Sequence, residues 1–83
     1  MTAAPESLTL YSTSWCPFCH MLKASLRAEG IEYREVDIDE TPGAASFVES
    51  VNNGNRTVPT LHYPDGTTQT NPSIEQVKAA LAA

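Results

Sequence analysis

In the first half of this 83-residue chain, the spacing of apolar residues predicts a short strand, then a helix, then a second strand. The run Leu-Thr-Leu-Tyr at residues 8–11 is typical of a buried strand. Apolar residues three and four positions apart predict a helix over residues 17–29, which Gly30 is suited to end. A second strand is expected over residues 31–38. The expected inward-facing stripe of the helix is Phe18, Met21, Leu22 and Leu26.

The second half of the chain predicts a helix, a hairpin and a final helix. Residues 42–52 have the clearest helical period, with apolar side chains at i, i+3, i+4 and i+7. Residues 57–63 predict a strand interrupted by Pro59, and a Pro-Asp-Gly turn then leads into a strand over residues 67–70. The sequence Asn-Pro-Ser opens the last helix, with Pro72 suited to its first position. The predicted order is βαβαββα, and the compact first strand–helix–strand unit favours parallel pairing.

Composition and charge narrow the classes of function. Residues 1–83 suit a single domain, with a formal net charge of -5. The five basic residues are scattered, which argues against nucleic acid because phosphate binding needs clustered Lys and Arg. No apolar run reaches membrane-spanning length, and residues 1–7 lack the features of a secretion signal. We therefore expect a cytoplasmic protein that binds neither nucleic acid nor membrane.

The two cysteines, Cys16 and Cys19, lie between the first predicted strand and the first predicted helix in the sequence Cys-Pro-Phe-Cys. In the cytoplasm such a pair is more often catalytic or metal-binding than structural. The unpaired N–H groups and the dipole of a helix start favour an anion, and the thiolate is the nucleophile in disulfide exchange. We expect Cys16 to be an exposed nucleophile and Cys19 to lie one helical turn deeper, able to reach back to it.

At these residues the chain resembles the glutaredoxins, whose pattern is Cys-Pro-Tyr-Cys at a strand–helix corner with Thr-Val-Pro far downstream. Here the second motif is residues 57–59, and the resemblance extends over essentially the whole chain. It implies a thioredoxin-like α/β fold, in which a four-stranded mixed sheet is flanked by helices on both faces. It also implies a cis bond before Pro59, with the Val58 backbone set against a thiol compound bound beside Cys16.

Two departures from the glutathione-using pattern bear on the choice of thiol. Typical glutaredoxins hold the carboxylates of glutathione with a Lys before the motif and a Gly-Gly-x-x-Asp turn before the last helix. Here residues 13–15 are Thr-Ser-Trp and residues 70–73 are Thr-Asn-Pro-Ser. The loss of charge-assisted contacts should weaken glutathione binding. The arrangement is more similar to the mycoredoxins of this family, which use mycothiol, a thiol that carries no carboxylate.

This resemblance implies a thiol–disulfide oxidoreductase that reduces mixed disulfides between proteins and mycothiol. Cys16 would attack the mixed disulfide and a second mycothiol would release it, with Cys19 as a resolving or protective thiol. The implied partners are mycothiolated or disulfide-containing proteins and mycothiol itself, kept reduced by a reductase. A monomer without bound cofactor or metal is expected. The implied substrate-binding residues are Trp15, Phe18, Arg56, Thr57, Val58, Pro59, Asn71 and Ser73.

Other functions fit parts of the pattern. A redoxin that supplies electrons to ribonucleotide reductase and is recharged by thioredoxin reductase is similar, but such redoxins carry Trp-Ser-Gly-Phe-Arg-Pro before the last helix. An iron–sulfur cluster would need ligands from a second chain or from free thiols. The sequence Cys-x-x-Cys-His at residues 16–20 also matches a haem attachment motif, which requires export.

Several side chains have simpler structural interpretations. His20 and Lys23 are expected on a solvated helix face, and His62 on a strand of the hairpin, unpaired with Cys16. Helix capping is the simplest role for Asn71 and Ser73.

Overall fold

Seven elements follow one another in the computed structural model, which describes residues 5–82. Their order is βαβαββα, which confirms the prediction from the sequence. The elements are β1 (Thr9–Ser12), α1 (Pro17–Ala28), β2 (Arg34–Asp37), α2 (Ala44–Val51), β3 (Thr60–His62), β4 (Thr68–Thr70) and α3 (Ile74–Ala82).

The four strands form one mixed sheet of order β2-β1-β3-β4, as expected. β1 pairs in parallel with β2, where Leu10 lies opposite Glu35, and antiparallel with β3, where Leu10 lies opposite Leu61. β3 and β4 form the predicted antiparallel hairpin. Because α1 follows β1 directly, the start of this helix lies just beyond the carboxyl end of an inner strand.

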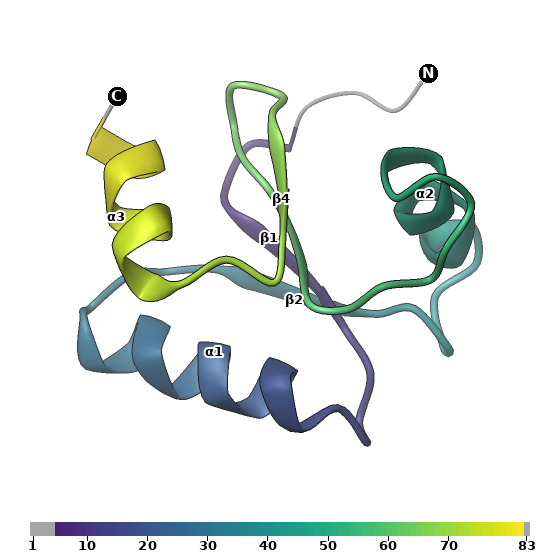
Figure 1. Cartoon of the computed structure of the whole chain (residues 1–83), viewed down its shortest axis with the longest axis horizontal. Helices are drawn as coiled ribbons and strands as arrows, with labels where there is room; N and C mark the ends of the chain where they lie inside the picture. The colour runs from purple at the N-terminus through teal and green to yellow at the C-terminus, as the bar shows by residue number, and fades with distance from the viewer. Residues whose placement is uncertain (1–4, 83) are drawn as a thin grey trace.

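Helices cover both faces of the sheet, with α1 and α3 on one side and α2 on the other (Figure 1). The core on the α1 and α3 side consists of Leu8, Leu10, Leu22, Leu26, Leu61, Tyr63 and Val77. The smaller core under α2 consists of Ile38, Ala44 and Val48, with Tyr11, Val36, Phe47 and Val58 among the residues packed against it. Burial of apolar surface on both faces is the main force that holds these layers together.

Several element bounds differ from the sequence prediction. β2 begins at Arg34 rather than at residue 31, because its partner β1 begins only at Thr9. β3 begins at Thr60 rather than at residue 57, since Pro59 has no N–H to contribute to a ladder. Likewise, α2 begins at Ala44 rather than at residue 42.

The inward-facing stripe predicted for α1 is wrong at two positions. Phe18 and Met21 are 59% and 65% exposed, whereas Cys19, Leu22 and Leu26 are buried. The helix is therefore rotated so that the second cysteine, rather than Phe18, faces the sheet. Apolar side chains on its first two turns are therefore left on the surface.

Ser73, rather than Pro72, defines the start of α3. The Ser73 hydroxyl accepts a hydrogen bond from the Gln76 backbone N–H at 3.1 Å, and the Gln76 side chain accepts one from the Ser73 N–H at 2.8 Å. This reciprocal pair is a capping box. Pro72 precedes it, so its predicted place at the first helical position is wrong, while the predicted cap at Ser73 is confirmed. Asn71 has a φ of 46° and lies outside the helix, so the cap predicted there is wrong.

Candidate active site

Cys16 is the N-cap residue of α1 and Pro17 occupies its first turn. The Cys16 backbone is extended, with φ -90° and ψ 110°, and its sulfur accepts a hydrogen bond from the Cys19 backbone N–H at 3.2 Å. One of the N–H groups that a helix start leaves unpaired is thus directed at the sulfur. The positive end of the helix dipole therefore lies beside Cys16 Sγ.

The expectation that Cys16 is exposed is wrong, because only 3% of the residue is accessible to solvent. Its side chain lies between the start of α1 and the segment before β3, where Sγ donates a long hydrogen bond to the Val58 carbonyl oxygen at 3.7 Å. An incoming disulfide must therefore be aligned with the sulfur by the residues around it.

Cys19 is fully buried on the inner face of α1. Burial, followed by the hydrogen bond with Cys16, raises the pKa of Cys19 to about 12, while the Thr13 backbone and the charge of Lys23 act in the opposite direction. At neutral pH Cys19 is therefore a thiol, and Cys16 is the cysteine placed to act first as a nucleophile.

A loop contributed by a distant part of the sequence completes the surroundings of Cys16. The Val58–Pro59 peptide bond is cis, as the resemblance implied. Pro59 is buried and Val58 half-buried. The Asn71 N–H donates to the Pro59 carbonyl oxygen at 2.8 Å, which ties the loop before α3 to this segment. Three parts of the chain thus meet: the start of α1, the Val58–Pro59 segment and the loop at residue 71.

Apolar side chains surround this meeting point on the surface. Trp15 is 71% exposed immediately before Cys16, and Phe18 and Met21 are exposed on the first turns of α1. Phe18, Asn71 and Ser73 line one shallow cavity of about 160 Å³ between α1 and the start of α3. The structure therefore brings these three predicted binding residues together, with Met21, which the helical spacing predicts in the core, as their neighbour.

Arg56 and Thr57 lie on the exposed approach to the Val58–Pro59 segment. The Arg56 Nε donates to a Glu49 carboxylate oxygen on α2 at 2.6 Å. A substrate carboxylate would have to compete with Glu49 for this guanidinium. The binding roles of Arg56 and Thr57 stay predictions.

Lys23 does not belong to a solvated helix face, contrary to the prediction. Its side chain is only 14% exposed, and its ammonium donates to a Glu35 carboxylate oxygen on β2 at 2.8 Å. Cys19, Leu22, Lys23 and Leu26 have the i, i+3, i+4, i+7 period of a buried stripe, but Phe18, Met21 and Leu22 fit the same period, so spacing alone does not decide between the two faces. His20, by contrast, is exposed as predicted.

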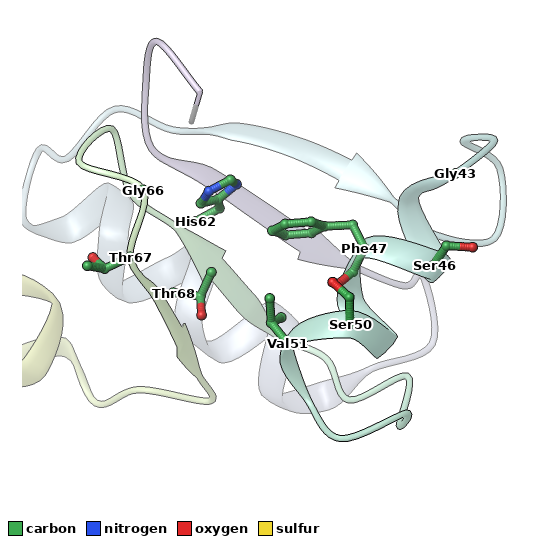
Figure 2. Close-up of a pocket in the computed structure, with 9 residues that line it drawn as sticks. All are labelled: Gly43, Ser46, Phe47, Ser50, Val51, His62, Gly66, Thr67 and Thr68. Carbon is green, nitrogen blue, oxygen red and sulfur yellow. The ribbon is translucent and has the colours of Figure 1, made fainter. Parts of the chain in front are cut away.

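A larger cavity, of about 850 Å³, lies between α2 and the β3–β4 hairpin (Figure 2). None of the predicted site residues lines it. His62, at the end of β3 as predicted, stacks on Phe47 there with ring centroids 4.7 Å apart. The cysteines, and not this cavity, therefore mark the candidate active site.

The described residues contain neither a metal-binding cluster nor a membrane-spanning helix. Over residues 5–82, no three His, Cys, Asp or Glu side chains converge in a way that could hold a metal ion. Within the same range no helix combines the length and apolar character needed to cross a bilayer.

Comparison with known proteins places these features in one family. The family model for glutaredoxin matches residues 8–66, which include both cysteines and the Val58–Pro59 segment. A Mycobacterium tuberculosis protein named as a glutaredoxin is 57% identical over 75 residues, covering 90% of this chain and 89% of that protein. Mycoredoxin 1 of Corynebacterium glutamicum is 46% identical over 78 residues, covering 94% and 96%.

Solved structures share the fold at lower identity. A variant of a thioredoxin-like protein superposes with a TM-score of 0.79 at 19% identity, covering 94% of this chain and 97% of that one. The glutaredoxin of Archaeoglobus fulgidus gives a TM-score of 0.71 at 23% identity, covering 94% and 88%. The thioredoxin-like fold expected from the sequence is thereby confirmed.

Proposed function

The chain belongs to the glutaredoxin family of thiol–disulfide oxidoreductases, and on that basis we propose that it reduces mixed disulfides between proteins and mycothiol. The observation that carries this proposal is the pairing of a helix-capping sulfur, Cys16, with a buried thiol, Cys19, behind it. Cys16 lies at the helix start, whereas Cys19 is buried behind it with a raised pKa, and this arrangement favours a route that uses Cys16 alone.

In this route the Cys16 thiolate attacks the mycothiol sulfur of a protein–mycothiol disulfide. The protein leaves as a thiolate, which takes up a proton, and Cys16 becomes disulfide-bonded to mycothiol. The thiolate of a second mycothiol then attacks that mycothiol sulfur. Oxidised mycothiol leaves and the Cys16 thiolate is regenerated. Cys19 is not needed for either exchange, and it can protect Cys16 from overoxidation by forming a disulfide with it.

Mycothiol is proposed as the co-substrate because the surroundings of Cys16 lack a free cationic clamp for carboxylates. No Lys precedes Cys16 in residues 13–15, and Arg56 is engaged with Glu49. Asn71 and Ser73 supply neutral polar groups beside the exposed ring of Phe18, which suits a sugar-containing thiol. The similarity to mycoredoxin 1 points in the same direction.

The proposal extends to partners and place of action. The protein would act as a monomer in the cytoplasm, on proteins that carry a mycothiol group or a disulfide. Mycothiol, kept reduced by a separate reductase, would recharge it without a bound cofactor.

The experiment that tests the thiol specificity compares two substrates that differ only in their thiol. One fluorescently labelled peptide is prepared as a mixed disulfide with mycothiol and with glutathione, and each is reduced with its own thiol as the recharging reagent. We expect the mycothiol substrate to be reduced at least about tenfold faster, because glutathione loses charge-assisted contacts that are each worth about 1.5–3 kcal/mol.

Faster reduction of the glutathione substrate would contradict the choice of thiol. Turnover that depends on thioredoxin reductase would favour the electron-donor redoxin instead. Visible absorption bands in protein purified without oxygen would favour a cluster-binding function.

A further inference from the structure

Lys23 lies one helical turn beyond Cys19 on the inner side of α1. Residues four apart on a helix have neighbouring side chains, so the Lys23 stem follows directly behind the buried sulfur. The Lys23 side chain is largely covered, in contrast to Arg27 one turn further on, which is exposed.

A short chain of hydrogen bonds holds the Lys23 ammonium in this position. Its partner is the Glu35 carboxylate on β2, at 2.8 Å. The same carboxylate oxygen accepts a hydrogen bond at 2.7 Å from the hydroxyl of Ser12, the last residue of β1. Ser12 is buried. The ammonium is thus fixed between α1 and two strands of the sheet, on the side of the sheet that faces Cys19.

Given thiol–disulfide oxidoreductase activity, on which this inference rests, we infer that Lys23 is a positioning residue for Cys19. Its fixed positive charge favours the thiolate form in which Cys19 attacks a mixed disulfide held on Cys16. Lys23 would then control how readily the protein leaves the route that uses Cys16 alone and closes its own disulfide.

The step governed by Lys23 is one exchange. Cys19 loses its proton to solvent, and its sulfur attacks Cys16 Sγ in the mixed disulfide. A Cys16–Cys19 bond forms while the bond from Cys16 to the outer thiol breaks. The outer thiol leaves with the electron pair as a thiolate. Both protein sulfurs are then oxidised and the original disulfide has been reduced to two thiols.

The electrostatics of Cys19 support this role. Lys23 is the one cation among the groups that affect the pKa of Cys19, and its charge lowers that pKa, although its effect is smaller than those of burial and of Cys16. The remaining contributors are Cys16 and the Thr13 backbone. Removal of the Lys23 ammonium should therefore raise the pKa of Cys19 further, because one group that opposes the effect of burial is lost.

Dithiobis(nitrobenzoate) separates the two exchanges in one experiment. Cys16 first releases one coloured thionitrobenzoate in a phase whose rate depends on reagent concentration. Cys19 then releases the second in a phase that does not. The variants are Lys23→Met, which keeps the aliphatic stem, and Lys23→Arg, which keeps the charge. Lys78→Met is the matched control, because it removes the 3.0 Å pair with Glu29 at the far end of α1.

We expect Lys23→Met to slow the second phase by about threefold or more and to leave the first phase unchanged. The thiolate population of Cys19 falls when the ammonium is removed, and each tenfold fall is offset in part by an about threefold gain in intrinsic nucleophilicity. Lys23→Arg should restore the second phase, and Lys78→Met should resemble the unsubstituted protein. If Lys23→Met fails to fold, as its circular dichroism would reveal, Lys23→Gln carries the same comparison.

An unchanged second phase in Lys23→Met would overturn the role of Lys23, as would equal slowing in Lys23→Met and Lys23→Arg. Neither result affects the proposed function. A missing first phase in the unsubstituted protein would instead contradict the oxidoreductase activity itself.

Discussion

Cys16 and Cys19 carry the same functional group, but the fold gives them different environments. Cys16 caps a helix and receives an N–H from the first turn, whereas Cys19 faces the interior and its pKa is raised to about 12, chiefly by burial. A thiol with so high a pKa is a poor first nucleophile at neutral pH. The division of labour between the two sulfurs therefore follows from their positions on one helical turn.

Serine substitutions test this division. We expect Cys16→Ser to abolish reduction of a peptide–mycothiol mixed disulfide, because a hydroxyl cannot replace the attacking thiolate. Cys19→Ser should retain a rate of the same order as the unsubstituted protein, because a second mycothiol can resolve the Cys16 mixed disulfide. Initial rates with the fluorescent peptide measure both effects.

Mass spectrometry of the stalled intermediate provides the control. Cys19→Ser should accumulate one mycothiol per chain when free mycothiol is withheld. Activity that survives in Cys16→Ser but not in Cys19→Ser would contradict the assignment of Cys16 as the nucleophile.

At the scale of single elements, the capping box at the start of α3 stabilises this helix next to the candidate active site. α3 begins with the Ser73–Gln76 capping box, and the loop before it bonds to the Pro59 carbonyl oxygen through Asn71. The cap therefore fixes the end of α3 that faces Phe18 and the shallow cavity.

Substitution of the capping residue measures this contribution. Ser73→Ala should lower the free energy of unfolding by about 1 kcal/mol, because the Gln76 N–H loses its acceptor. Ser50→Ala is the matched control. The Ser50 hydroxyl donates to a carbonyl oxygen within α2, a bond that adds little to helix stability. Urea unfolding followed by circular dichroism gives both values, and an equal loss in the two variants would argue against the capping box.

The order and type of the elements could be predicted from the sequence because periodicity and turn residues are local signals. The Pro-Asp-Gly turn and the period of α2 specified the hairpin and the second helix in this way. Strand ends could not be predicted, since β2 extends only as far as β1 pairs with it. The rotation of α1 was also missed, because Phe18 and Cys19 are adjacent and both apolar, and only packing decides which one is buried.

At the scale of the whole molecule, the site exists only where segments far apart in the sequence meet. The spacing of the two cysteines is local and could be recognised. The contact between Cys16 and Val58 spans 42 residues, and the sequence indicated it only through resemblance to a family. The ion pair between Lys23 and Glu35 depends on how α1 lies over β2, and no local pattern specifies that placement.

His62, on the face of the sheet opposite Cys19, makes the free energy of unfolding depend on pH. His62 is buried there against Phe47. Burial lowers the pKa of His62 below its usual 6.5, although a hydrogen bond with the Gly66 backbone opposes this effect. Between the lowered pKa and about 6.5 the unfolded chain binds a proton that the folded chain does not, so stability rises with pH. The stability that depends on a neutral His62 is fully present above about pH 6.5 and is lost as the pH falls through the folded-state pKa of His62.

We therefore expect the urea concentration at the unfolding midpoint of the unsubstituted protein to decrease as the pH is lowered from about 7 to about 5. In His62→Gln this concentration should depend less steeply on pH. The lowered pKa values of the Glu35 and Asp65 carboxyls affect stability only at more acidic pH, because a carboxyl in the unfolded chain titrates near 4. His20→Gln removes an exposed histidine from α1 and should leave the profile as steep as before. If His62→Gln remained as pH-sensitive as the unsubstituted protein, the sensitivity would have to arise elsewhere in the molecule.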